Sequence, residues 1–218
     1  ADIPVSARIA ENASMGTAIA GGLIAGNGRY SMVANWAALG DVTASGVNFN
    51  ANTSSFAGGL GGQLTGLVQN CYGAGDLSLS NKTKANTPYS GVLVGQASQA
   101  VIVDGYFNSG AAAVVNGETA ELSALGGNTN SAVKNVAAKS MGSESFTATM
   151  NGGLSEAGMA AADEWLTSDD VGYEAAELKA LRPDVWYGWI LEGGRTLLGD
   201  KAYEEPKDPA GVFDSGSG

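Results

Sequence analysis

The sequence contains no histidine and a single cysteine, Cys71, among its 218 residues. Catalytic triads that depend on histidine, zinc sites built from histidine and cysteine, and disulfides within the chain are therefore excluded. Long apolar runs are also missing, because glycine interrupts them, so no segment is expected to cross a membrane. We expect no cofactor, no metal site and no catalytic residues in this chain.

Charged residues are scarce, at 15% of the chain, and they are unevenly distributed. Residues 1–117 hold five acidic and four basic residues, whereas residues 118–218 hold 17 and seven, so the second region carries nearly all of the net charge of −11. Nucleic acids and anionic membranes bind basic surfaces, so neither is an expected partner. The change in composition predicts two regions, 1–117 and 118–200, followed by a linker or tail at 201–218.

Glycine, by contrast, is abundant, with 33 residues, and it recurs in an internal repeat of about 35 residues. Three segments align without gaps: VANWAALGDV (33–42), VQNCYGAGDL (68–77) and VDGYFNSGAA (103–112). A second block precedes each segment, and its leucines, Leu23, Leu60 and Leu93, are spaced by 37 and 33 residues. The connecting loops therefore vary in length while the segments keep their pattern.

Small or apolar residues occupy every second position of each segment, as Trp36 and Ala38 do. This period of two indicates a β-strand with one buried face, and the recurrent glycines disfavour a helix. One such unit does not cover its own apolar face, whereas stacked units do. We predict a mainly β fold, a β-solenoid or β-roll of about three coils, with Val33, Val68 and Val103 adjacent in one inward column. A β-sandwich of duplicated hairpins is the alternative.

At these residues the chain resembles the GLUG repeat of bacterial surface proteins, including regions attached to some IgA-specific metallopeptidases. The family pattern is GGLVG, a short turn and I-x-N-C-Y-x-x-G-x-V, and AGGLGGQLTGLVQNCYGAGDL (57–77) matches it nearly throughout. The resemblance covers residues 17–115. It implies an extracellular, repeat-built region and brings no catalytic residues with it.

Two copies depart from the family pattern. The copy at 17–42 has Trp36 where the family often has cysteine. The copy at 89–110 departs most, with Asp104-Gly105 in place of the Asn-Cys pair.

Residues 118–200 are predicted to form an acidic α+β cap over the open end of the solenoid, since exposed strand edges aggregate. They also resemble the tail that often follows such repeats. Four elements are expected: a short helix in 140–153, helices in 155–166 and 168–183, and a closing hairpin in 182–198. Ser155 is the predicted N-cap of the second helix, and Asp169 and Asp170 are predicted at the start of the third.

Trp186, Tyr187 and Trp189 form the candidate binding cluster, because aromatic rings suit stacking on the apolar faces of sugars. In a strand, Trp186 would face one side, and Tyr187 and Trp189 the other. Tryptophan is mostly buried in proteins, so packing against the predicted cap helices is the competing interpretation.

Asp41 and Asp76 are in register at turns and are expected about 5 Å apart on adjacent coils. Two such carboxylates could contribute to a calcium site, whereas an aspartate that follows glycine more often bonds to the backbone of its turn. Ser131 and Lys134 fit the S-x-x-K pattern of penicillin-recognising enzymes, but the accompanying S-D-N and K-T-G motifs are missing.

We therefore expect a non-enzymatic extracellular module at the cell surface, serving as a spacer, display or adhesion region of a larger bacterial surface protein. No basic segment followed by an apolar core opens the chain, so a mature product or an excised segment is expected. The alternative is a carbohydrate-binding or diverged β-helix carbohydrate-active module. The sequence does not identify a partner, which leaves a glycan or protein of a host or cell surface.

Overall fold

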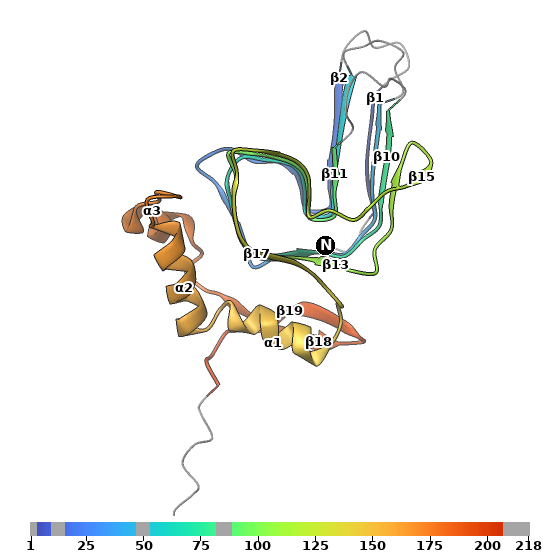
Figure 1. Ribbon diagram of the computed structural model, residues 1–218. Coiled ribbons are helices and arrows are strands. Elements are labelled where there is room, and N and C mark those ends of the chain that lie inside the picture. Colours follow the sequence, from blue (N-terminus) through green and yellow to red (C-terminus); the bar gives the residue numbers. More distant parts are fainter. Residues whose placement is uncertain (1–3, 10–15, 47–52, 82–88, 207–218) are drawn as a thin grey trace, which may run out of the picture.

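The computed structural model describes residues 4–9, 16–46, 53–81 and 89–206. In these ranges the chain is mainly β and winds into a solenoid of about three coils, as predicted (Figure 1). The α+β region that follows lies beside the stacked coils.

Four parallel sheets form the sides of the coils. The first sheet contains β1 (Val5–Ile9), β6 (Val42–Gly46), β10 (Leu77–Asn81) and β14 (Ala113–Val115), with the short β15 (Glu118–Thr119) antiparallel to β14. The second contains β2 (Gly16–Gly21), β7 (Thr53–Gly58) and β11 (Tyr89–Gly91). The third contains β3 (Ile24–Gly26), β8 (Gly61–Leu64), β12 (Val94–Ser98) and β16 (Leu125–Thr129). The fourth contains β4 (Met32–Ala34), β9 (Leu67–Gly73), β13 (Val101–Asn108) and β17 (Ala132–Lys139), and β5 (Ala37–Ala38) also pairs with β9.

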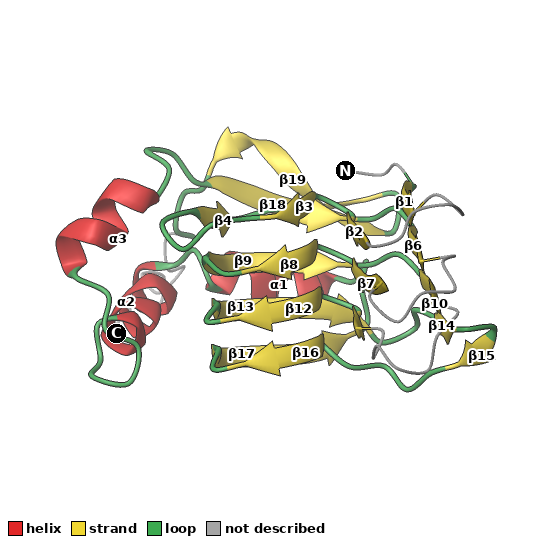
Figure 2. Ribbon diagram, turned by 90° about the horizontal axis from the view of Figure 1, so that it is seen from above, coloured by secondary structure: helices red, strands yellow, loops and turns green. Residues whose placement is uncertain are grey.

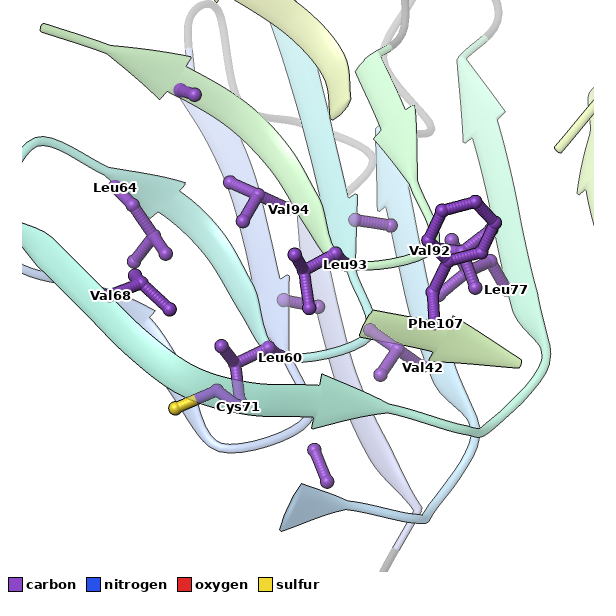
Figure 3. Packing of buried hydrophobic residues seen from close by; sticks show 14 of the residues in the cluster. Val42, Leu60, Leu64, Val68, Cys71, Leu77, Val92, Leu93, Val94 and Phe107 are labelled. Carbon is purple, nitrogen blue, oxygen red and sulfur yellow. The ribbon is translucent and has the colours of Figure 1, made fainter. Parts of the chain in front are cut away.

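The leucines of the second repeat block lie next to one another in successive coils and form an inward column. Leu23 N donates to Leu60 O at 2.9 Å, and Leu60 N donates to Leu93 O at 2.8 Å. Leu60 and Leu93 are fully buried, and their side chains point into the interior together with Val68 and Cys71 (Figure 3). The spacings of 37 and 33 residues therefore reflect turns of different length around a constant core.

The valine column differs from the prediction in its third member. Val33 lies opposite Val68, but Val68 lies opposite Ile102, and Val103 lies opposite Gln69. A shift of one residue moves a side chain to the other face of a sheet. Val103 accordingly points outward and packs in a separate cluster, so its predicted place in the inward column is wrong.

The solenoid also extends further along the chain than residue 117. Strands β16 and β17 lie in the stretch that sequence analysis assigns to the cap, yet they pair with β12 and β13 and continue the third and fourth sheets (Figure 2). They begin a fourth, partial coil.

The remaining elements are three helices and a hairpin. They are α1 (Glu144–Gly152), α2 (Glu156–Leu166), α3 (Ala175–Leu181), β18 (Tyr187–Glu192) and β19 (Arg195–Ala202). These elements lie along the outer face of the fourth sheet (Figures 1 and 2). One cluster joins Tyr72 and Tyr106 to α1 and β18, and another joins Leu67 and Val103 to α2 and α3. Because β9 and β13 are the central strands of that sheet, the region covers the side of the solenoid, which differs from the end cap expected.

The predicted starts of the helices hold in one case and fail in another. Ser155 caps α2, as predicted, with its Oγ accepting a hydrogen bond from Gly158 N at 3.0 Å. The third helix does not begin at Asp169, because residues 168–172 form a turn in which Gly172 has a left-handed φ of 78°. That helix, α3, begins only at Ala175.

Candidate functional site

Four asparagine or aspartate residues occupy the same corner of successive coils in the fourth sheet. They are Asn35, Asn70, Asp104 and Asn135, with left-handed φ values of 59°, 52°, 53° and 55°. Asparagine and aspartate tolerate this backbone conformation better than most residues. The corner turns the chain, and we call the four side chains the corner ladder.

The upper rungs of the corner ladder fasten the α+β region to the solenoid. Asn70 Nδ2 donates to Asn35 Oδ1 at 3.0 Å and to Met150 O of α1 at 3.1 Å. Asn35 Nδ2 donates to Tyr187 O of β18 at 2.7 Å. Asn35 and Asn70 are both buried, so the bonds that Asn70 makes to Asn35 and Met150 are shielded from water.

The lower rungs bring three polar side chains together. Asn135 Nδ2 donates to Asp104 Oδ1, and also to Tyr106 Oη at 2.8 Å. Burial raises the pKa of the Asp104 carboxyl above its ordinary value, while the Asn135 hydrogen bond and the charge of Lys134 oppose the rise. Burial, assisted by the negative charge of Asp104, raises the pKa of Tyr106 to about 12. Tyr106 therefore remains a neutral phenol at physiological pH.

A groove of about 330 Å³ separates these lower rungs from α1 and α2. The wall formed by the helices consists mostly of small residues, among them Gly152, Gly158 and Ala161. Lys134 Nζ donates to Ala161 O at 3.1 Å and lies 5.9 Å from the ring centroid of Trp165. The groove thus offers a carboxyl, a phenol, an amide and an ammonium group, which can form hydrogen bonds to a polar ligand.

The predicted glycan-binding residues are not brought into one exposed surface. Trp189 is only 3% exposed, and its ring centroid lies 5.6 Å from that of Tyr72. Tyr187 is 41% exposed, and a register shift between it and Trp189 separates the two in the hairpin. Trp186 is partly buried and lines a different groove, next to Arg182.

Asp41 and Asp76 bond to the backbone of the next coil. Asp41 Oδ1 accepts a hydrogen bond from Asp76 N at 2.9 Å, and Asp76 Oδ1 accepts one from Ala112 N at 2.8 Å. Both side chains are exposed at the turns. Within the part of the chain that the structure describes, no three histidine, cysteine, aspartate or glutamate side chains gather as a metal site would require.

Ser131 and Lys134 have separate structural partners. Ser131 Oγ accepts a hydrogen bond from Ala100 N at 3.0 Å, whereas Lys134 Nζ reaches the carbonyl of Ala161 in α2. The S-x-x-K spacing therefore serves the connection between coils and the contact with α2.

A second groove, of about 280 Å³, lies between the turn before β4 and the α2–α3 connection. Tyr30 on its rim is 77% exposed, and Arg29 Cζ lies 6.0 Å from the centroid of the Tyr30 ring. Tyr173 and Glu177 line the opposite side. Sequence reasoning missed this groove, because its residues come from segments far apart in the chain.

Sequence reasoning also missed the corner ladder, although a signal was present. Asparagine or aspartate residues recur at steps of 35, 34 and 31 residues from Asn35 to Asn135.

None of the described helices is long and apolar enough to cross a membrane. No family model, no curated protein and no solved structure matches this chain.

Proposed function

We propose that this chain is a non-enzymatic extracellular repeat module of a larger bacterial surface protein, where it serves as a spacer, display or adhesion region. The resemblance to GLUG repeats supports an extracellular setting. The observation that carries the proposal is the use of polar side chains to bind one coil to the next. Asn70 bonds to Asn35, and Asp76 bonds to the backbone of the coil that follows.

Such bonds between coils suit a protein region that bears mechanical load or keeps two other regions of a protein a fixed distance apart. Two bonds of the corner ladder, Asn35–Asn70 and Asp104–Asn135, join coils whose strands lie in parallel register, so these coils resist slipping past one another. The inward column of Val33, Val68 and Ile102 reaches the last strand, β17, where its final member is left exposed. Val133 lies opposite Ile102 in the last strand and is 44% exposed, because none of the described coils covers it.

The location can be tested on cells that produce the parent protein. Antibodies raised against the folded chain should label intact cells, and external protease should remove the signal before lysis. A cytosolic protein followed in parallel is the control and should survive. Detection only after lysis would contradict an extracellular role.

The absence of catalysis can be tested on a panel of acidic and neutral polysaccharides. The chain should release no reducing ends from any of them, because the described carboxylates at the turns bond to backbone N–H groups. Turnover that disappears in an Asp76→Asn variant would overturn this part of the proposal.

Glycan binding is the second candidate, and the groove beside Tyr30 is the observation that favours it. An exposed tyrosine ring next to arginine and glutamate side chains offers both a stacking face and hydrogen-bonding groups. A glycan array with Tyr30→Ala and Tyr187→Ala variants separates the two exposed tyrosines. Loss of a signal in Tyr30→Ala alone would place binding in this groove, and an empty array would remove this candidate.

A further inference from the structure

Asn70 Oδ1 is a buried oxygen with no hydrogen-bond partner within the described ranges. Its orientation is fixed, because both hydrogens of Asn70 Nδ2 are used, one on Asn35 Oδ1 and one on Met150 O. Exchanging the oxygen and nitrogen would place the oxygen against two other oxygens. A buried acceptor left without a donor is costly, so the structure calls for a hydrogen at this place.

The repeat indicates where that hydrogen comes from. Asn70 Nδ2 donates to Asn35 Oδ1 in the preceding coil, and Asn135 Nδ2 donates to Asp104 Oδ1 in the same direction. The strand pairing places Asp104 beside Asn70, and Oδ1 of Asp104 accepts from Asn135, so the other carboxyl oxygen, Oδ2, takes the place of an amide nitrogen. An ionised carboxylate has no hydrogen to give, so two acceptors would face each other there.

We propose that Asp104 holds a proton in the folded protein and donates it through Oδ2 to Asn70 Oδ1. The neutral carboxyl then substitutes for asparagine, accepting from Asn135 with one oxygen and donating to Asn70 with the other. The corner ladder becomes continuous through four coils. The corner is therefore a proton-binding site.

The surroundings of Asp104 favour the neutral form. Its side chain is 9% exposed, and burial raises the pKa of the carboxyl. Tyr106 on the same strand shares the Asn135 amide with Asp104, and it is neutral at physiological pH. Lys134 on β17 is the only charged group besides Asp104 among the described residues lining the groove, and it opposes protonation. The wall formed by α1 and α2 adds Thr149 and small residues without charge.

The proton also bears on how the α+β region is held. Asn70 is bonded on one side to Met150 O of α1 and would be bonded on the other to Asp104. A Cβ on Gly153 would lie 2.7 Å from Asn70 Oδ1, so the connection after α1 approaches this oxygen closely. Loss of the proton leaves two hydrogen-bond acceptors, Asp104 Oδ2 and Asn70 Oδ1, facing each other next to that connection. We therefore expect α1 to dock more weakly as the pH rises.

The direction of the pH dependence follows from linkage. A carboxyl whose pKa is higher in the folded than in the unfolded protein stabilises the fold most below its unfolded pKa, and this stabilisation is lost as pH rises through the folded value. An asparagine at this position supplies the hydrogen at every pH. The stability of the Asp104→Asn variant should therefore equal that of the unchanged protein at acidic pH and exceed it at higher pH.

The experiment compares melting temperatures of the whole chain and its Asp104→Asn variant between about pH 4 and pH 8. We expect the variant to melt roughly 2–4 °C higher at the upper end, with the gain shrinking toward zero at the lower end. Asp76→Asn is the matched control, because it removes the charge of an exposed aspartate outside the corner ladder, and it should show no such trend. A gain independent of pH, or no gain at all, would overturn the proposal.

Carbon NMR of the Asp104 carboxyl supplies a measurement that needs no variant. The carboxyl should titrate above the ordinary range of aspartate, and the protection of the α1 amides, relative to Asp104→Asn at equal pH, should fall across the same interval. A titration within or below the ordinary range would refute a bound proton even if the variant failed to fold.

Discussion

Tyr72 on β9 packs against Trp189 on β18, with 5.6 Å between their ring centroids. The Tyr72 hydroxyl donates to Thr196 O of β19, and its ring meets Phe146 of α1 edge-on at 5.2 Å. Strand, helix and hairpin thus meet at one side chain of the second coil. The α+β region is fastened to the solenoid by this contact.

Replacing Trp189 by alanine should therefore destabilise the whole chain. Removing a buried tryptophan costs about 3–5 kcal/mol, and Trp189 is 3% exposed. Tyr187→Ala is the control in the same hairpin, and it should cost less because Tyr187 is 41% exposed. Urea unfolding followed by circular dichroism measures both. Equal stability of the two variants would show that Trp189 does not anchor the hairpin.

Leu60→Asp should prevent folding, because it places a carboxylate in the middle of the leucine column. Leu60 is fully buried between Leu23 and Leu93, and a buried unpaired charge costs several kcal/mol. Ser78→Asp introduces the same charge at an exposed position of β10 and should fold. Thermal melting distinguishes the two, and a normal melt for Leu60→Asp would refute the assigned core.

The period-two pattern and the repeat predict the stacked coils because each coil must bury the same face. Leu23, Leu60 and Leu93 kept their alignment although their spacing changes, since the leucines fill a common interior. Ser155 likewise reveals the start of α2, because an N-cap acts through local geometry.

The outer face could not be predicted in the same way. An ungapped spacing of 35 residues aligns Val68 with Val103, but the strand pairing places Ile102 there. Val68 and Val103 are both apolar and both buried, one inward and one beneath the helices, so hydrophobicity does not reveal the slip. The pair Asp104-Gly105 lies beside Asn70-Cys71, and this corner residue marks the correct register.

Calcium and chelator should leave the melting temperature unchanged. Asp41 and Asp76 bond to backbone N–H groups of the next coil, and these bonds need no cation. Asp76→Ala should cost at most about 1 kcal/mol, since it removes one exposed hydrogen bond. Differential scanning calorimetry with calcium and with chelator measures whether the melting temperature changes. A calcium-dependent rise that disappears in Asp76→Ala would instead indicate a bound ion.

Stability should fall in alkaline solution from about the ordinary cysteine pKa upward. Burial raises the pKa of the Cys71 thiol to about 12, and that of Tyr72 to about 12 as well. The folded protein then keeps protons that the unfolded chain releases, so each further rise in pH favours unfolding until the folded values are reached. Cys71→Ala should reduce this loss. Cys71 should also resist alkylation until urea unfolds the chain, and rapid labelling of the folded protein would contradict its burial.

The fragment 1–139 should oligomerise or precipitate, and the structure indicates which surface is responsible. This fragment lacks the α+β region, and four side chains on the outer face of the fourth sheet that are buried in the whole chain become exposed: Leu67, Tyr72, Val103 and Tyr106. Large exposed apolar patches promote association. The same fragment leaves the edge strand β17 as it is in the whole chain, since the helices pack on the face of the sheet.

A rescue experiment separates the face from the edge. Threonine at these four positions keeps a high strand propensity while removing most of the apolar surface, and it leaves the inward column intact. If the uncovered face drives association, the fourfold threonine variant of 1–139 should remain monomeric in light scattering and melt cooperatively. If the strand edge drives it, as an end cap would require, the substituted fragment should associate as readily as the original one. An unsubstituted fragment that is already monomeric would show that the α+β region does not shield the solenoid at all, and would favour an independent binding role for that region.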